Sequence, residues 1–220
     1  MLQAEGLVKS YGNLTILKSV SLNIQAGEIV SIVGSSGAGK TTLLSLLGTL
    51  AKPDSGTIAF EGTILNTLNN RKLAAFRNLN LGFIFQFYQL LPEFTALENV
   101  MMPALIAGIS KSEAQKKAKA LLLELGLEQR SLNKPSALSG GEQQRVAVAR
   151  ALVNAPKIIF ADEPSGNLDS LNAQKLHDLF FELRQKYGFT FVIVTHNTEL
   201  AARADRQIQL IDGQIAGSVN

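Results

Sequence analysis

The sequence predicts an α/β fold with a parallel-sheet core, an antiparallel β subdomain and an inserted α-helical subdomain. Three continuous runs of apolar residues carry the prediction of the core, at 29–33, 158–161 and 189–194. Runs that are apolar on both faces are typical of buried parallel strands. Segments with helical periodicity lie between them, and this alternation indicates a sheet covered by helices on both faces.

The other elements follow from local patterns along the chain. Short alternating segments indicate antiparallel strands, and they lie at 2–8, 15–24 and 57–60. Apolar residues recur at helical spacing in four segments, at 41–50, 111–125, 142–153 and 172–187. The segment 87–150 has no clear strand and contains several helical patterns. We therefore expect a single domain over 1–220, with a catalytic core and β subdomain formed by 1–86 and 151–220 and a helical subdomain formed by 87–150.

Composition excludes several classes of protein. With 220 residues, 46% of them hydrophobic, the chain can bury one sizeable core, and without cysteine it has no disulfide framework and no thiolate metal site. No secretory signal begins the chain, and its longest uncharged apolar stretch, 100–109, is too short to span a bilayer, so we expect a cytosolic protein. The net charge is only +3. We interpret Lys116, Lys117 and Lys119 as a solvated helix face, and expect no nucleic-acid partner.

A glycine-rich motif follows the first apolar run. Its residues are Gly34, Ser35, Ser36, Gly37, Ala38, Gly39, Lys40 and Thr41. They match the phosphate-binding pattern G-x-x-x-x-G-K-[ST], with a strand before and a helix after. Glycines let backbone N–H groups close around phosphate oxygens, while Lys40 neutralises phosphate charge and the Thr41 hydroxyl can ligate Mg²⁺. The motif predicts a site for ATP with Mg²⁺.

Two carboxylates, Asp162 and Glu163, end the second apolar run. In a protein with a phosphate-binding loop, a carboxylate at the end of a neighbouring strand suits Mg²⁺, so Asp162 is the candidate metal ligand. Glu163 is then positioned to orient or deprotonate the attacking water. The third run leads to His196. Because ligands gather at the carboxyl ends of parallel strands, we interpret His196 as a γ-phosphate sensor, and His177, in a polar helical context, as structural.

A second helix start carries adjacent glycines. Its residues are Leu138, Ser139, Gly140, Gly141, Glu142, Gln143, Gln144 and Arg145. Ser139 with Glu142 three residues later predicts a capping box, and the helix that follows should bury Val146, Ala149, Leu152 and Val153. A cap does not require two glycines, which cost helix stability, so exposed glycine amides indicate a second anion-binding terminus. A symmetric dimer that places the loop of one copy against the glycine pair of the other would use both.

With these motifs in this order, the chain resembles the nucleotide-binding subunits of ABC transporters over essentially its whole length. The resemblance implies a P-loop NTPase (RecA-like) core and an ATPase that works as a head-to-tail homodimer around two ATP molecules. It further assigns the following residues: Tyr11 to stacking on adenine, 34–42 (with Thr42) to the Walker A loop, Gln86 to sensing Mg²⁺, 138–145 to the signature motif, Asp162 and Glu163 to the Walker B pair, Asp169 to the D-loop, and His196 to the switch histidine.

Within this family, segments 81–100 and 165–169 look most like the lipoprotein-releasing (Lol) ATPase and its macrolide-exporter relatives. The resemblance implies a peripheral subunit at the cytoplasmic face of a bacterial inner membrane. Its partners would be permease subunits with few membrane helices, and the task would be the release of lipoproteins toward the outer membrane. Two positions depart from the family pattern: Asn197 stands where aspartate is usual, and Ser165 where many relatives have threonine.

Other functions stay open at this point. The chain could energise another exporter of the same type, or it could be a cell-division ATPase that signals across the membrane without transport. A DNA-repair or chromosome ATPase is disfavoured because no long coiled coil separates Lys40 from Leu138, and a fused exporter because no membrane helix follows. The apolar segment 87–109 allows two interpretations, a surface covered by a partner or the core of the helical subdomain.

Overall fold

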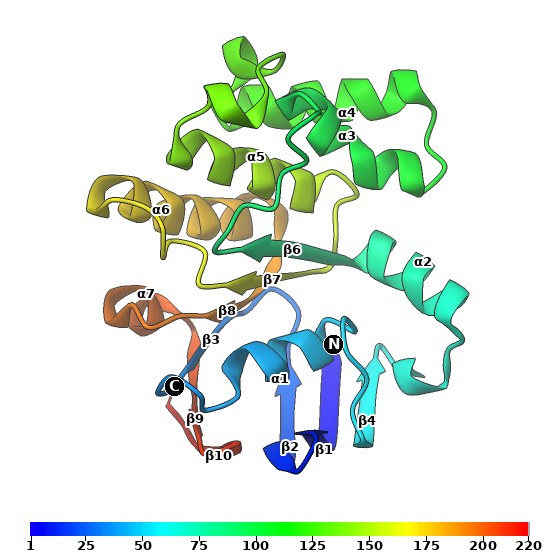
Figure 1. Ribbon diagram of the computed structural model, residues 1–220, viewed down its shortest axis with the longest axis vertical. Coiled ribbons are helices and arrows are strands. Elements are labelled where there is room, and N and C mark those ends of the chain that lie inside the picture. Colours follow the sequence, from blue (N-terminus) through cyan, green and yellow to red (C-terminus); the bar gives the residue numbers. More distant parts are fainter. Residues whose placement is uncertain (220) are drawn as a thin grey trace. The chain divides into compact units, whose positions relative to one another are not determined.

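The computed structural model describes residues 1–219, and the chain divides into two compact units (Figure 1). Unit 1 comprises residues 1–77 and the chain from Leu183 onward, and unit 2 comprises residues 78–182. Residues 78–86 and 151–182 therefore group with the helices of unit 2, whereas the sequence placed them in the catalytic core. The predicted division into core and helical subdomain stays a prediction.

Unit 1 contains the antiparallel sheet that the alternating segments predicted. Its strands stand in the order β2-β1-β4-β5, with bounds β1 (Leu2–Tyr11), β2 (Leu14–Ile24), β4 (Ser55–Phe60) and β5 (Thr63–Ile64). Alternate side chains of β1 are buried, among them Leu2, Ala4 and Leu7. One face of this sheet thus contributes to the core, as period-2 patterning requires.

The phosphate-binding loop belongs to a second set of strands in unit 1. β3 (Ile29–Val33) pairs in parallel with β8 (Thr190–Val194) on one side and β9 (Arg206–Ile211) on the other, and β10 (Gln214–Val219) pairs antiparallel with β9. The predictions for 29–33 and 189–194 are confirmed. We had not predicted β9 and β10, because polar residues such as Gln207 and Gln209 interrupt the apolar pattern.

Helices complete unit 1. They are α1 (Lys40–Leu47), the 3₁₀ helix η1 (Leu65–Thr67) and α7 (Thr198–Arg203), and two further helices, α2 (Asn70–Asn80) and α6 (Ser170–Tyr187), run across the boundary between the units. α1 buries Leu43, Leu44, Leu46 and Leu47. This helix was predicted at 41–50, and it ends earlier, at a glycine C-cap, Gly48.

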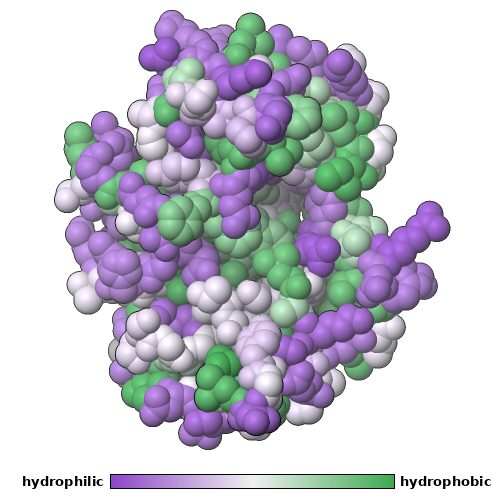
Figure 2. All heavy atoms as spheres, in the orientation of Figure 1, coloured by the Kyte–Doolittle hydropathy of each residue, from purple (hydrophilic) through white to green (hydrophobic). Residues whose placement is uncertain are grey.

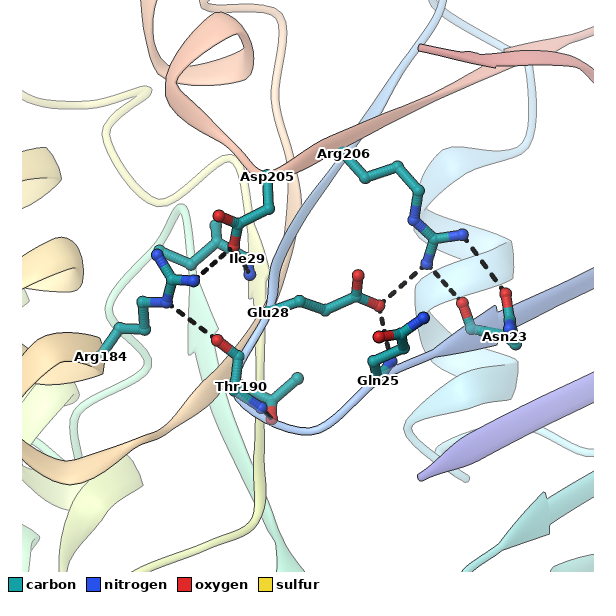
Figure 3. A network of polar contacts seen from close by, with 9 residues as sticks. Asn23, Gln25, Glu28, Ile29, Arg184, Thr190, Asp205 and Arg206 are labelled. Atoms are coloured by element: carbon teal, nitrogen blue, oxygen red, sulfur yellow. Dashed lines mark hydrogen bonds and ion pairs between the residues drawn. The ribbon is translucent and has the colours of Figure 1, made fainter. Parts of the chain in front are cut away.

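A network of charged residues fixes the start of β3 (Figure 3). One carboxylate oxygen of Asp205 accepts from the backbone N–H of Ile29 at 2.8 Å and from Arg184 at 3.1 Å. Glu28, on the other side of the strand, accepts from Arg206 at 2.9 Å. Because charge-assisted bonds are stronger than neutral ones, the network anchors the strand that leads to the phosphate-binding loop.

Unit 2 combines one strand pair with the helical part of the chain. β6 (Leu81–Phe85) and β7 (Ile158–Asp162) pair in parallel, and the helices are α3 (Ala96–Ile106), α4 (Lys111–Glu124) and α5 (Gly140–Leu152), with 3₁₀ turns η2 (Glu128–Arg130) and η3 (Pro135–Ala137). The predicted absence of strands from 87–150 is confirmed. β6 had not been predicted, since five residues bounded by polar ones give a short signal.

Surface properties agree with the composition. Within residues 1–219, no helix is both long enough and apolar enough to span a bilayer. Figure 2 shows a face on which hydrophilic side chains predominate and hydrophobic ones form scattered patches.

Candidate functional site

The phosphate-binding loop joins β3 to α1 in unit 1, and its backbone needs glycine at two positions. Gly37 has φ +79° and Gly39 has φ +101°, in the left-handed region that other residues avoid. Gly39 is also the N-cap of α1, so the first N–H groups of this helix open toward the loop. The loop can therefore surround an anion with backbone donors, as the motif predicted.

Close packing beneath the loop explains Gly34. A Cβ at Gly34 would overlap the backbone carbonyl oxygen of Leu210 in β9, and a Cβ at Gly39 would lie 2.9 Å from a methyl carbon of Leu17 in β2. The turn after β9 adds a clamp: Gly213 donates its N–H to the carbonyl of Ala38 at 3.1 Å and accepts from the N–H of Lys18 at 2.8 Å. Sequence reasoning missed Gly213, for which an Asp-Gly turn was the only signal.

Lys40 lies over this loop. Its ammonium donates to the backbone carbonyl oxygens of Gly34 and Ser35, at 2.9 Å each. The loop thereby keeps a positive charge next to its own N–H groups. Thr41 is exposed and Thr42 half-buried, directly after the lysine in the first turn of α1. Exposed backbone N–H groups and a lysine ammonium suit the phosphates of a nucleoside triphosphate, and a threonine hydroxyl suits the divalent cation bound with it.

His196 stands at the same sheet edge as the loop. β3 and β8 are in parallel register, with Ile32 opposite Val194, and the N–H of Thr195 extends the ladder to the carbonyl of Ile32 at 3.2 Å. Gly34 and His196 each follow two residues after this pair, and His196 is exposed. Adjacent strands lie about 4.8 Å apart, so the ends of β3 and β8 bring the two residues to one edge.

Asn197 and Tyr11 complete the picture of unit 1. The Asn197 side chain caps α7, accepting from the N–H of Leu200 at 2.8 Å, so the departure from the usual aspartate keeps a good N-cap residue. Tyr11 ends β1 and is 56% exposed, which leaves ring surface available for a base. The ammonium of Lys9 lies 5.4 Å from the centre of this ring, within the range of a cation–π contact.

In unit 2 the carboxyl ends of β6 and β7 carry the predicted catalytic groups. Phe85 of β6 is opposite Asp162 of β7, so Gln86 and Glu163 follow at the ends of neighbouring strands. Glu163 has φ +45°, which is uncommon for a residue other than glycine. Such strain is found at functional sites, where surrounding contacts maintain it.

Those contacts come from the loop after β7 and from α5. The carbonyl of Glu163 accepts from the N–H of Gly166 at 3.0 Å, and the carbonyl of Pro164 accepts from the side chain of Gln144 at 2.6 Å. Gln144 is fully buried in α5. The sequence analysis named Gln144 as part of the signature motif but assigned it no role of its own. A polar residue on the buried face of an apolar helix was the signal available.

Gln86 is held by a reciprocal pair of hydrogen bonds. Its side-chain amide donates to the side-chain oxygen of Asn167 at 3.2 Å, and Asn167 donates to the backbone carbonyl of Gln86 at 3.0 Å. Gly166 lies against the same amide, since a Cβ there would be 2.9 Å from its nitrogen. The amide oxygen of Gln86 and the carboxylate of Asp162 are of the kind of hard oxygen ligand that Mg²⁺ prefers.

The helix start at Ser139 forms the predicted capping box. The Ser139 hydroxyl accepts from the N–H of Glu142 at 3.3 Å, and the Glu142 carboxylate accepts from the N–H of Ser139 at 2.8 Å. The Ser139 hydroxyl also donates to this carboxylate, at 2.9 Å. The hydrogen bonds that the carboxylate accepts, first from the Ser139 backbone and then from its hydroxyl, with Arg130 adding a contact, lower the pKa of Glu142. Four predicted core positions of this helix are buried, namely Val146, Ala149, Leu152 and Val153.

Asp169 caps α6, and His177 is buried in the same helix. Asp169 accepts from the backbone N–H of Asn172 at 2.9 Å and from its side-chain amide at 2.6 Å, and these bonds lower the pKa of Asp169. His177 is 2% exposed, and its Nε2 lies 3.0 Å from the Ser165 hydroxyl. The sequence suggested a polar context for His177, whereas the helix turns it inward toward the loop after β7.

Comparison with known proteins identifies this set of motifs. Residues 17–166 match the protein family described as ABC transporter. The chain belongs to this family. It is an ATP-binding and ATP-hydrolysing subunit, and the predicted recognition and enzyme class are confirmed.

Solved structures confirm the fold as a P-loop NTPase of the α/β class. The dimeric post-hydrolysis state of the ATP-binding cassette MJ0796 bound to ADP and Pi is 40% identical, with a TM-score of 0.92 over 100% of this chain and 98% of that one. CbiO1 of Clostridium perfringens, part of the ABC transporter complex cbiONQ, is 28% identical, with a TM-score of 0.89 over 100% of this chain and 88% of that one.

Curated relatives named lipoprotein-releasing system ATP-binding protein LolD match the chain almost end to end. The protein from Bacteroides thetaiotaomicron is 58% identical over 215 residues, 98% of this chain and 99% of the relative. The protein from Porphyromonas gingivalis is 60% identical over 213 residues, 97% of each chain.

Proposed function

We propose that the chain is the ATPase subunit of a lipoprotein-releasing transporter. The observation that carries this proposal is the 57–60% identity to LolD proteins over 97–98% of the chain. It is supported by an intact set of nucleotide-binding motifs in both units. A further support is the sequence of segments 81–100 and 165–169, which resembles the Lol ATPase and its macrolide-exporter relatives.

In the proposed cycle, the loop of unit 1 binds the phosphates of ATP. Its backbone N–H groups and the Lys40 ammonium hold the phosphate oxygens, with 35–39 and Thr42 shaping the loop, and Tyr11 stacks on adenine. Lys40 then exchanges its bonds to the carbonyls of Gly34 and Ser35 for bonds to phosphate. The exchange is favourable because a charged acceptor binds an ammonium more strongly than a neutral carbonyl does.

The metal ligands, the base and the γ-phosphate contact are proposed from groups that lie at or after the ends of β3, β6, β7 and β8 in the chain. Mg²⁺, held by Thr41, Gln86 and Asp162, would neutralise charge on the phosphates. Glu163 orients and deprotonates the attacking water, and His196 holds the γ-phosphate side of the site. The strained backbone of Glu163 supports its role as base, because this role requires the carboxylate to be held in a fixed position.

The second anion-binding terminus supports a homodimer. Ser139, Gly140 and Gly141 of one copy would bind the γ-phosphate held by the loop of the other, with Glu142 fixing the helix start and Asp169 contacting the partner. The capping box supports this role because it holds the Ser139 backbone without using the N–H group of either glycine. Two copies in head-to-tail orientation would enclose two ATP molecules.

Permease subunits are the proposed membrane partners, and the chain would lie at the cytoplasmic face of the inner membrane. The sequence left two interpretations of the apolar segment 87–109, a surface covered by a partner or the core of the helical subdomain, and its residues include examples of both. Val100 and Ala104 are fully buried in the helical region, whereas Phe87 is 70% and Ile106 is 69% exposed. Exposed aromatic and aliphatic side chains support a surface that a partner covers.

Purification from the membrane tests the substrate class. A tagged chain is isolated in mild detergent with the membrane proteins that accompany it, and a lipoprotein-releasing permease is the expected companion. Phe87→Ser with Ile106→Ser should reduce this recovery while MgATP binding persists. Recovery of a cell-division protein, or of an exporter of another substrate, would contradict lipoprotein release and leave the ATPase assignment intact.

A further inference from the structure

A side chain of α6 lies against the glycine pair of the signature helix. If Gly141 carried a Cβ, that atom would lie 3.0 Å from the side-chain oxygen of Asn172 and 3.1 Å from its Cγ. Such distances are shorter than ordinary carbon contacts, so the amide of Asn172 fills the space that any other residue at 141 would occupy. Gly141 is buried, and Asn172 is half-buried between α5 and the solvent.

The other end of the same amide binds Asp169. The Asn172 side-chain nitrogen donates to one carboxylate oxygen of Asp169 at 2.6 Å, while the Asn172 backbone N–H donates to the other oxygen at 2.9 Å. Asp169 could cap α6 through the backbone bond alone. The side-chain bond is an addition, and it fixes which way the amide points: nitrogen toward Asp169, oxygen toward Gly141.

This orientation is electrostatically favourable at both ends. A carboxylate accepts from the amide nitrogen, and the amide oxygen faces the first turn of α5, where the helix dipole is positive. One neutral side chain thereby links two segments that are 28 positions apart in sequence, Gly141 and Asp169. Both segments belong to the surface that the proposed dimer offers to its partner.

We propose that Asn172 is a positioning residue. It holds Asp169 and Gly141 in a fixed relative position, so that both approach the nucleotide of the partner copy together. The proposal rests on the proposed head-to-tail dimer. Asn172 touches no reacting atom and acts through the two residues it joins. Without its amide, the glycine pair and Asp169 would have to be ordered separately at each encounter with the partner's ATP, and the entropy of that ordering opposes closure.

Mixed dimers separate this role from simple stabilisation. One copy carries Ser139→Arg, which disables its signature, and the other carries Lys40→Ala, which disables its phosphate-binding loop. A dimer with different affinity tags on the two copies then has one complete site, built from the loop of the Ser139→Arg copy and the signature of the Lys40→Ala copy. Phosphate release by this dimer is the reference rate.

Asn172→Ala is then placed in either copy. In the Lys40→Ala copy, which supplies the signature to the live site, it should lower phosphate release about tenfold, as expected for the loss of one charge-assisted hydrogen bond. The same substitution in the Ser139→Arg copy should have a much smaller effect, with a factor of rate loss at least five times smaller than in the Lys40→Ala copy. KM for ATP should change little in comparison with kcat, because the loop in unit 1 supplies most ground-state binding.

Gln174→Ala is the matched control. Gln174 lies in the same helix, and its side chain donates to Asp178 at 3.1 Å, so the substitution removes a hydrogen bond of α6 away from Gly141 and Asp169. It should have equal, small effects in either copy. Equal loss from Asn172→Ala in both copies, or a larger loss in the Ser139→Arg copy, would overturn the inference. Failure of the reference dimer to hydrolyse ATP would instead overturn the proposed dimer.

Discussion

Arg150 of the signature helix binds the backbone that follows β6. Its guanidinium donates to the carbonyl oxygens of Tyr88 and Gln89, at 2.9 and 2.6 Å. Gln89 has φ +48°, so these bonds hold a strained segment three residues after Gln86. Burial of the guanidinium lowers the pKa of Arg150, which still leaves a charged donor because arginine titrates far above neutral pH. α5 thereby fixes the chain next to a predicted metal ligand.

Arg150→Met should destabilise the protein. The substitution keeps an unbranched apolar stem but leaves the partly buried carbonyl oxygen of Tyr88 and the exposed one of Gln89 without their donor, at a cost of about 1–3 kcal/mol. Urea unfolding followed by circular dichroism measures the change. Lys116→Met, which removes a cation from an exposed position of α4, is the control and should stay within about 0.5 kcal/mol. Equal unfolding midpoints for the two variants would refute the role of Arg150.

Glu163→Gln should bind MgATP and hydrolyse it at a rate at least 100-fold below wild type, since general-base catalysis contributes about 10²–10⁴-fold. The amide keeps the shape of the side chain but cannot accept the proton of water. Size-exclusion chromatography with ATP should show an accumulated dimer, whereas the wild-type chain returns to monomer after turnover. Hydrolysis at the wild-type rate would remove Glu163 from the role of base.

Ser139→Arg and Gly141→Asp should abolish turnover while an isolated copy keeps its affinity for ATP. Ser139→Arg would place a side chain where the partner's phosphates would lie. A Cβ at position 141 would meet the side chain of Asn172 at 3.0 Å and disturb the glycine pair. Neither substitution alters the loop in unit 1. Fluorescence titration with a nucleotide analogue at low protein concentration measures binding to the monomer. Loss of binding under these conditions would argue against the arrangement in trans.

Gly34→Ala should weaken ATP binding through the fold of the loop. The new Cβ would overlap the carbonyl oxygen of Leu210, a backbone atom that cannot move without disturbing β9. We expect at least a tenfold rise in the dissociation constant, measured by calorimetry. Gly62→Ala is the control for a lost glycine, because a Cβ there would meet nothing within 4 Å although φ is +82°. Gly34→Ala with unchanged affinity would contradict the close packing of loop and strand.

Stability should depend on pH through the capping box of α3. Hydrogen bonds from the Thr95 backbone, and next from its hydroxyl, lower the pKa of Glu98 below the value in the unfolded chain. A carboxylate with a lowered pKa contributes stability above its unfolded pKa of about 4.3, and the contribution disappears as pH falls through the folded value. The wild-type protein should therefore have a higher melting temperature than Glu98→Gln at pH 6. This difference in melting temperature should shrink as the pH falls toward 3.

Glu113→Gln is the matched variant for that comparison. Glu113 occupies the same N3 position in α4, where the Ser110 hydroxyl accepts from its backbone N–H at 3.3 Å. Its melting temperature should differ less from wild type across the same pH range. A gap for Glu98→Gln that is constant from pH 3 to pH 6 would show that the titration of Glu98 contributes nothing.

Much of the site could be predicted because its residues act through local backbone geometry. Gly37, Gly39, Lys40 and the capping box at Ser139 owe their conformations to neighbours within a few positions. The apolar runs ending in Asp162 and near His196 could be located for a similar reason, because a strand buried on both faces has to be continuously apolar. The lipoprotein-release proposal also began with sequence, in segment 81–100.

Only the tertiary structure decided which distant residues support those motifs. Nothing in the sequence joins Gly34 to Leu210, Asn172 to Gly141 or Arg150 to Gln89, because each contact depends on strands and helices packing at a particular register. β9, with its alternation interrupted by glutamines, could not be located before its pairing with β3 was known. The sequence by itself determined the chemistry of this protein, since motif residues carry their own donors, charges and turns, and long-range packing decided how those groups are held.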